Sequence, residues 1–158
     1  MKKSILFIGG FVVGVILTAV IFWSVMPGMM LNINESKLGF EETVAEIEKS
    51  AIESGWKVPK IYNIQASLQK DGFTEMTKLK ILSICQPTHA FNILKNDNDK
   101  KVSAIMPCRI SVYEDTNGNV FIGGMNNGLM SKMFGGNIAE VMGGVAEEEH
   151  NMLRHIIK

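Results

Sequence analysis

The chain has 158 residues, and its 16 basic and 16 acidic side chains give a formal net charge of zero. Residues 31–158 hold 14 of the basic residues and all of the acidic ones, which leaves this part slightly acidic. A nucleic-acid-binding surface needs a basic face, so this composition argues against nucleic acid as a partner. The chain beyond residue 30 is long enough for one domain with its own core, and too short for two.

The first predicted element is an apolar helix at the N-terminus. The uncharged run from Ile5 to Met26 would span roughly 33 Å as a helix at ~1.5 Å per residue, enough to cross a ~30 Å hydrocarbon layer. Pro27 and Gly28 are typical of a helix end. We therefore predict that residues 1–30 form an uncleaved transmembrane signal anchor. The alternative is a cleaved signal peptide, but such peptides have a shorter apolar core and a small-x-small cleavage site.

The lysines around this run predict its orientation. Lys2 and Lys3 precede it, and the next basic residue is Lys37. Positive charge favours the cytoplasmic side, so we expect a single-pass protein of the cell membrane, with a cytoplasmic N-terminus and a periplasmic or other extracytoplasmic domain. Gly10 and Gly14 lie on one helix face and would let two anchors pack closely, so a homodimer is expected.

Apolar periodicity predicts the elements in the first half of the domain. Apolar residues at helical spacing indicate an amphipathic helix over residues 40–54, and Gly55 fits its left-handed stop. The other elements predicted here are a linker or first strand over 31–38, a strand over 57–64, a helix or loop over 65–72 and a buried strand over 77–85.

Turn-forming residues and glycines predict the elements in the second half of the domain. The predicted elements are a short helix over 88–94 with Thr88 as its N-cap, a polar turn over 96–101, strands over 102–106 and 109–114, a hairpin turn over 115–119, a return strand over 120–124 and a long helix from about Gly128 to His155. Glycine pairs inside the last helix require a kink, a close approach or a ligand. The order of elements predicts an α+β domain with helices on one face of a curved antiparallel sheet.

Three segments of the chain resemble the family called domain of unknown function DUF302. They are residues 55–59 (GWKVP), residues 84–87 (ICQP) with Ala90 and Leu94, and residues 106–114 (MPCRISVYE). The resemblance covers about residues 35–157 and implies a fold like one half of the TATA-binding-protein saddle, with the order β-α-β-β-β-β-α. It also implies dimers or tandem repeats, and it implies no established activity. Gln86 stands where the family pattern leads us to expect asparagine, and His89 lies outside that pattern.

Cys85 and Cys108 both lie beside a proline at the end of a predicted strand. Cys85 precedes a predicted helix whose N-terminus would stabilise a thiolate, and Arg109 beside Cys108 could act in the same way. Thiol-based redox or sulfur-transfer chemistry is therefore one alternative function. The other roles open to the pair are a disulfide, which an extracytoplasmic location permits, and plain packing, because buried cysteine behaves as a small apolar residue.

Sulfur and imidazole side chains raise a second alternative, a carrier of Cu(I) or haem. Met125, Met130 and Met133 supply thioethers, and thioether and thiolate ligands select Cu(I). Methionine also fills irregular cores, and there is no C-x-x-C-H haem-attachment motif. His150 and His155 are five residues apart, a poor spacing for one helix face. The sequence accordingly predicts no cofactor and no metal site.

The motifs of hydrolases and nucleotide-binding proteins are missing from the sequence, which argues against an enzyme. The glutamates at 147–149 are predicted as a solvated helix face. The function we predict is binding of a small ligand, itself unknown, or of a partner protein near the membrane, in a groove between the sheet, the glycine-rich residues 123–128 and the two cysteines. The predicted ligand-binding residues, of which the cysteines are also the catalytic candidates, are Cys85, Cys108, Arg109, Tyr113, Gly124 and Asn126.

Overall fold

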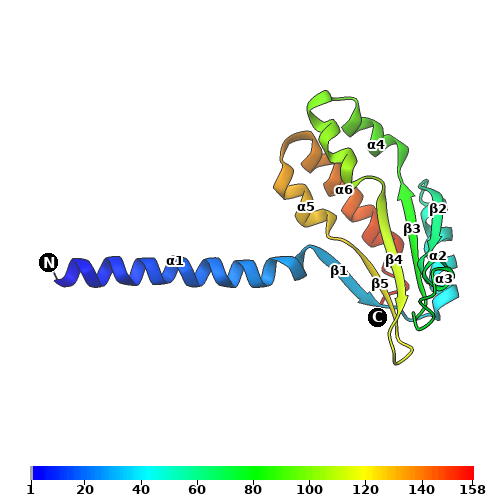
Figure 1. Ribbon diagram of the computed structural model, residues 1–158. Helices are drawn as coiled ribbons and strands as arrows, with labels where there is room; N and C mark the ends of the chain where they lie inside the picture. The colour runs from blue at the N-terminus through cyan, green and yellow to red at the C-terminus, as the bar shows by residue number, and fades with distance from the viewer. Residues whose placement is uncertain (1) are drawn as a thin grey trace.

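A computed structural model describes residues 2–158, with side chains from Phe7 onward. It consists of a long N-terminal helix and one α+β domain built on a five-stranded sheet (Figure 1). The helices are α1 (Lys2–Met29), α2 (Phe40–Glu53), α3 (Ile64–Lys70), α4 (Pro87–Leu94), α5 (Asn127–Phe134) and α6 (Gly136–Leu153), with a 3₁₀ helix η1 (Asp97–Ile105). The strands are β1 (Leu31–Glu35), β2 (Lys57–Asn63), β3 (Leu79–Cys85), β4 (Cys108–Glu114) and β5 (Val120–Met125).

The sheet is antiparallel throughout, with the strand order β1-β5-β4-β3-β2. A tight turn joins β4 to β5, and Gly118 in that turn has a φ of 85°, which glycine adopts without steric cost. In the centre of the sheet, Ile84 of β3 lies opposite Cys108 of β4. The predicted α+β class and the antiparallel sheet are confirmed, and the predicted short helix is present as α4. The region that could be a helix or a loop forms α3, and η1 is an element that the sequence did not predict.

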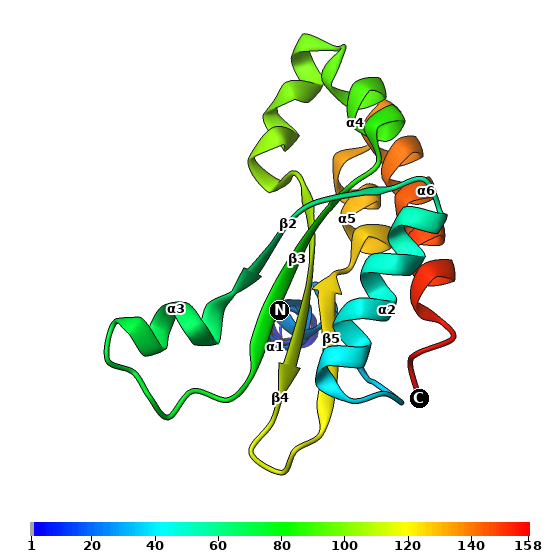
Figure 2. The ribbon, with the colours of Figure 1, turned by 90° about the vertical axis from the view of Figure 1, so that its right-hand side faces the viewer.

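The core of the domain lies between one face of the sheet and the helices α2 and α6, which run side by side over that face (Figure 2). Alternate residues along a strand point to the same face, and those of the central strands are fully buried here: Leu82, Ile84, Ile110 and Val112. The apolar stripe of α2 packs on them through Phe40, Val44, Ile47 and Ala51. Each such side chain contributes about 1.5–3 kcal/mol when it is fully buried, which explains why these elements form as the sequence predicts.

The helix α1 contains one stretch, Phe7–Met29, that is long and apolar enough to cross a membrane by its length and composition. A signal sequence near an N-terminus meets the same criterion. The helix ends at Met29, slightly beyond the predicted stop, because Pro27 is accommodated inside its last turn. The side chains of Lys2 and Lys3, on which the predicted orientation rests, lie outside the described residues.

The domain has a core that is independent of α1. Every member of its two apolar clusters lies between Leu38 and Ile157. The end of α1 meets the domain at Asn126. Its side-chain amide donates to the Met29 carbonyl oxygen at 2.9 Å, and its backbone N–H donates to the Met30 carbonyl oxygen at 2.8 Å. Since none of the core depends on α1, residues 31–158 are expected to fold by themselves.

The predicted strand over residues 102–106 is wrong. Residues 102–105 belong to η1, which ends before Met106. Val102 is only 3 % exposed because it packs in a second apolar cluster with Ile93 of α4. A strand here would need a neighbour to pair with. In the described part of the chain, residues 102–106 pair with no strand of the sheet, and β4 begins only at Cys108. The apolar residues of the segment are therefore buried against helices.

The predicted long C-terminal helix is divided in two. α5 ends and α6 begins at Gly135 and Gly136, which have φ values of 69° and 55°. These angles cannot continue a right-handed helix, and glycine adopts them readily. The second glycine pair stays inside α6, where a Cβ atom on Gly144 would lie 3.7 Å from the His89 ring of α4. One pair thus makes a kink and the other lies at a close helix contact.

Candidate functional site

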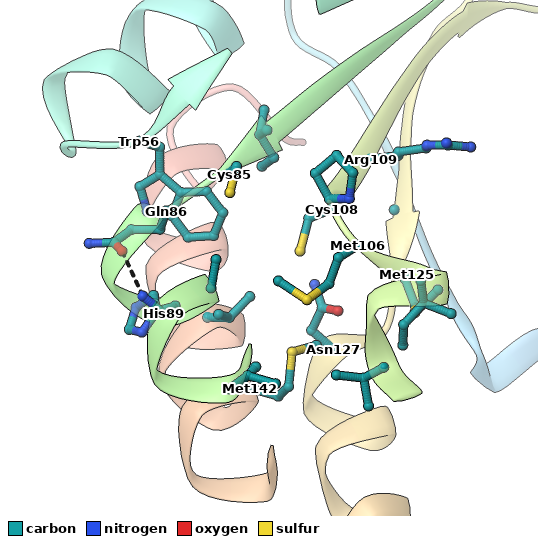
Figure 3. Close-up of a pocket in the computed structure, with 18 of the residues that line it drawn as sticks. Trp56, Cys85, Gln86, His89, Met106, Cys108, Arg109, Met125, Asn127 and Met142 are labelled. Atoms are coloured by element: carbon teal, nitrogen blue, oxygen red, sulfur yellow. Dashed lines mark hydrogen bonds between the residues drawn. The ribbon is translucent and has the colours of Figure 1, made fainter. Parts of the chain in front are cut away.

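A cavity of about 420 Å³ lies where the ends of β3, β4 and β5 meet the helices α4, η1, α5 and α6 (Figure 3). Both cysteines line it from the two central strands. Most of the remaining lining is apolar and comes from the helices, including Ile93, Ile138 and Met142. Cavities of this size and composition hold small organic molecules.

The polar side chains of the lining are largely occupied by bonds within the protein. The Ser111 hydroxyl donates to the Gly123 carbonyl oxygen at 3.1 Å. The side-chain oxygen of Gln86 accepts from the backbone N–H of His89 at 2.9 Å and so caps α4. Few donors or acceptors are thus left for a ligand, which makes the cavity suited to an apolar one.

The cap of α4 differs from the predicted one. Thr88 was expected as the N-cap, but Pro87 occupies the first helical position, where its missing N–H costs nothing. The cap is therefore the residue before the proline, Gln86. This arrangement fixes the first turn of α4 and with it the position of His89 beside the cavity.

One wall of the cavity is held by a carboxylate that joins two rings. The Trp56 indole N–H donates to Glu148 at 2.8 Å, and the His89 Nε2 atom lies 2.9 Å from the other oxygen of the same carboxylate. The two rings meet edge to face, with 6.4 Å between their centroids. Trp56 is only 3 % exposed and also packs in the main core, so this wall is a rigid part of the fold.

A second carboxylate lies behind the opposite wall. Glu149 is 8 % exposed, accepts from the Asn127 side-chain amide at 2.6 Å, and packs so closely on β5 that a Cβ atom on Gly124 would lie 3.0 Å from it. Burial raises its pKa to about 7, although the bond from Asn127 opposes this shift. The predicted solvated face is therefore wrong for Glu149, because α6 turns this residue toward the sheet.

The two thiols face the cavity and are free. Burial raises the pKa of Cys108 to about 12, and the charge of nearby Glu149 and the neighbouring Cys85 act in the same direction. At neutral pH the Cys108 side chain is thus a neutral thiol, which is a poor nucleophile. His89 forms no hydrogen bond with Cys85 within residues 7–158, so no base activates that thiol in this arrangement.

The structure brings four of the six predicted ligand-binding residues to the cavity. Cys85, Cys108, Arg109 and Gly124 contribute to its lining, although the guanidinium of Arg109 points away from it (Figure 3). The other two lie elsewhere. Tyr113 stacks on Phe121 across the hairpin at 5.4 Å, and Asn126 caps α5 by accepting from the Leu129 backbone N–H at 3.0 Å.

The residues that sequence reasoning missed are those that converge only in three dimensions. Trp56, His89 and Asn127 line the cavity, and Glu148 and Glu149 hold them from behind. Trp56 lay inside a quoted family motif, which could have drawn attention to it. The glutamates carried no such signal, because a run of three acidic residues is typical of an exposed helix.

The structure is a small α+β domain with an apolar cavity, and comparisons with other proteins agree with the fold. A family model for the domain of unknown function DUF302 matches residues 33–158, so the chain belongs to the DUF302 family. The crystal structure of the uncharacterized conserved protein DUF302 from Bacillus stearothermophilus matches with a TM-score of 0.71 and 24 % identity, over 80 % of this chain and 97 % of that one. A comparison with curated proteins finds no match.

Proposed function

We propose that this domain binds a small, predominantly apolar molecule in the cavity between the sheet ends and the helices. The observation that carries the proposal is the cavity itself, whose volume of about 420 Å³ and mainly apolar lining fit a small organic ligand. The engaged polar groups of its wall favour a ligand with few hydrogen-bonding groups. The apolar side chains of the lining, mostly aliphatic, would provide most of the contact surface.

The location of the cavity relative to α1 supports a role at a membrane. Leu31, which lies two residues beyond the end of α1, lines the cavity and is itself exposed. If α1 spans the bilayer, the cavity opens close to the membrane surface, where apolar molecules concentrate. We place the domain outside the cytoplasm in this proposal because positive charge precedes α1. Pairing of two chains through Gly10 and Gly14 belongs to the same proposal.

The thiol-based alternative has less support. The neutral state of the Cys108 thiol and the lack of a hydrogen-bonded base at Cys85 both disfavour a nucleophilic role. Binding of an apolar ligand requires neither an ionised Cys108 thiol nor a base beside Cys85. Redox or sulfur-transfer chemistry by the two cysteines therefore remains a prediction from the sequence, and we base no mechanism on it.

Filling the cavity should abolish ligand binding without unfolding the domain. Ala90 of α4 lines the cavity and is half-buried, so the phenyl ring of Ala90→Phe would occupy ligand space. We expect this variant of residues 31–158 to bind the uncharged fluorophore N-phenyl-1-naphthylamine at least about tenfold more weakly, which corresponds to an overpacking cost of 1–3 kcal/mol. Trp56, the single tryptophan of this fragment, reports binding by energy transfer to the fluorophore.

A matched control is available in α3. Ala66 has the same degree of burial but lies outside the cavity lining, so Ala66→Phe should bind the fluorophore as the unchanged fragment does. Equal affinity of all three proteins would contradict the proposed site. Far-ultraviolet circular dichroism of each variant establishes that it is folded.

The proposed orientation makes a separate prediction. Alkaline phosphatase, which is active only outside the cytoplasm, should be active when it is fused after Lys158 of the full chain in a bacterial host. The same fusion without residues 1–30 should be inactive. Activity lost in the full-chain fusion would show that the domain stays in the cytoplasm, and the membrane fraction would then establish whether α1 still anchors it.

A further inference from the structure

Five sulfur-containing side chains line the cavity, and Met125 at the end of β5 is one of them. The other four come from β3, from the start of β4 and the residues before it, and from α6. Cys85 ends β3, Cys108 begins β4, Met106 precedes β4 by two residues, and Met142 lies on α6. Figure 3 shows all four side chains with their sulfur atoms directed toward the cavity. We propose that these two cysteines and two methionines form a site for Cu(I), in which the two thioethers and one thiolate bind the ion and the other cysteine lines the site as a neutral thiol. This function goes beyond the apolar binding proposed above.

The sulfur ligands of this site favour Cu(I) over other metal ions. Thiolate and thioether sulfur atoms are soft ligands, which prefer Cu(I) over hard or borderline cations. Within residues 7–158, no three histidine, cysteine, aspartate or glutamate side chains are grouped so that they could hold an ion. Zinc, which takes four such ligands in structural sites, therefore lacks its usual donors here. Cu(I) requires none of them beyond the two thiols.

The two methionines pack in the second apolar cluster and also line the cavity beside the thiols. Met142 is 8 % exposed and Met106 is half-buried, and both border open space beside the thiols. Met133 of α5, which the sequence offered as a soft ligand, is instead exposed and does not line the cavity. Methionine side chains are flexible enough to close around an ion without a change in the backbone.

The charge of the complex predicts how many protons the two thiols release when Cu(I) binds. A Cu(I) ion bound by one thiolate and two thioethers forms a neutral complex, whereas two thiolates would leave a negative charge in an apolar cavity, which is costly. Binding should therefore release one proton, from one of the two thiols, while the second thiol stays protonated. The metal keeps its oxidation state, so the step needs no reductant or oxidant once Cu(I) is supplied.

The test is an anaerobic titration of residues 31–158 with Cu(I) against a chromophoric Cu(I) chelator. We expect one Cu(I) per chain, one proton released in unbuffered solution, and sulfur-only coordination by X-ray absorption. The double variant Met106→Leu/Met142→Leu should bind Cu(I) at least roughly tenfold more weakly, since loss of even an outer-shell partner has effects of this size. Met133→Leu should bind it unchanged.

The two proposals for the cavity can fail independently. Leucine keeps the lining apolar, so the Met106→Leu/Met142→Leu variant should still bind N-phenyl-1-naphthylamine, and retained binding also establishes that it is folded. No uptake of Cu(I) in competition with the chelator would overturn the metal site. Undiminished uptake by the methionine double variant would equally overturn it, because the cysteines alone would then hold the ion.

Discussion

The stability of the domain should fall as the pH rises from about 4.5 to above 7, and Glu149→Gln should remove much of this dependence. The pKa of Glu149 is raised from 4.5 to about 7, so the folded state binds the proton more tightly than the unfolded chain does. The stabilisation is complete below pH 4.5 and is lost as the pH rises through 7. At 1.36 kcal/mol per pKa unit, the loss in the free energy of unfolding is roughly 3 kcal/mol.

Glutamine is a good mimic of the protonated side chain. Its amide oxygen can still accept from Asn127, and it carries no charge to bury against Gly124. We expect Glu149→Gln to match the unchanged domain near pH 5 and to be more stable than it at pH 8. Urea unfolding of residues 31–158 between pH 5 and pH 8 measures both curves.

The neighbouring Glu147 provides the control for this experiment. It is exposed on the same helix, so Glu147→Gln should leave the pH dependence as it is in the unchanged domain. All other ionisable groups are common to the three proteins, so the comparison isolates the effect of position 149. If the curve for Glu149→Gln runs parallel to that of the unchanged domain, the buried carboxylate does not control the pH dependence.

Replacing Trp56 should have the largest effect on the stability of any single change at the cavity wall. Trp56→Ala removes a side chain that packs in the main core and leaves a hole beside the cavity, so we expect a loss of about 3–5 kcal/mol in the free energy of unfolding. Trp56→Phe keeps most of the packing but loses the indole N–H that binds Glu148. It should cost about 1–3 kcal/mol.

An exposed aromatic residue gives the comparison for Trp56. Phe73 lies after α3 and is 65 % exposed, so Phe73→Ala should change the free energy of unfolding by no more than about 0.5 kcal/mol. Urea denaturation at one pH of the unchanged domain, Trp56→Ala, Trp56→Phe and Phe73→Ala gives the order of their free energies of unfolding. A Trp56→Ala variant as stable as Phe73→Ala would mean that the wall of the cavity is not part of the cooperative core.

The apolar cavity and the buried carboxylate are connected, and this connection bears on function. Asn127 lines the cavity and donates to Glu149, and both residues also line a small hollow of about 70 Å³ beside Asn32. A ligand that presses on Asn127 therefore acts on the bond to Glu149. Ligand affinity measured at pH 5 and pH 8 on Glu149→Gln and the unchanged domain would reveal any such coupling.

The elements that local sequence predicts well are those whose burial follows a simple period. The α2 stripe repeats at helical spacing, and the strands β3, β4 and β5 alternate or are apolar throughout, so their apolar faces are visible in the sequence. The turn before β5 carries Asn117 and Gly118, a strong local signal. These features, together with the quoted motifs, were sufficient to predict the α+β class and the DUF302 family.

The sequence by itself determined the apolar helix, the pattern of strands and the family, because each depends on residues that are neighbours along the chain. Only the tertiary structure decided that residues 102–106 bury their apolar side chains against helices, since their neighbours Ile138 and Met142 of α6 are distant in sequence. The tertiary structure also decided which residues form the wall of the cavity. Trp56, His89 and Glu148 are far apart in sequence, and the contacts that join them exist only after α6 has packed across the sheet.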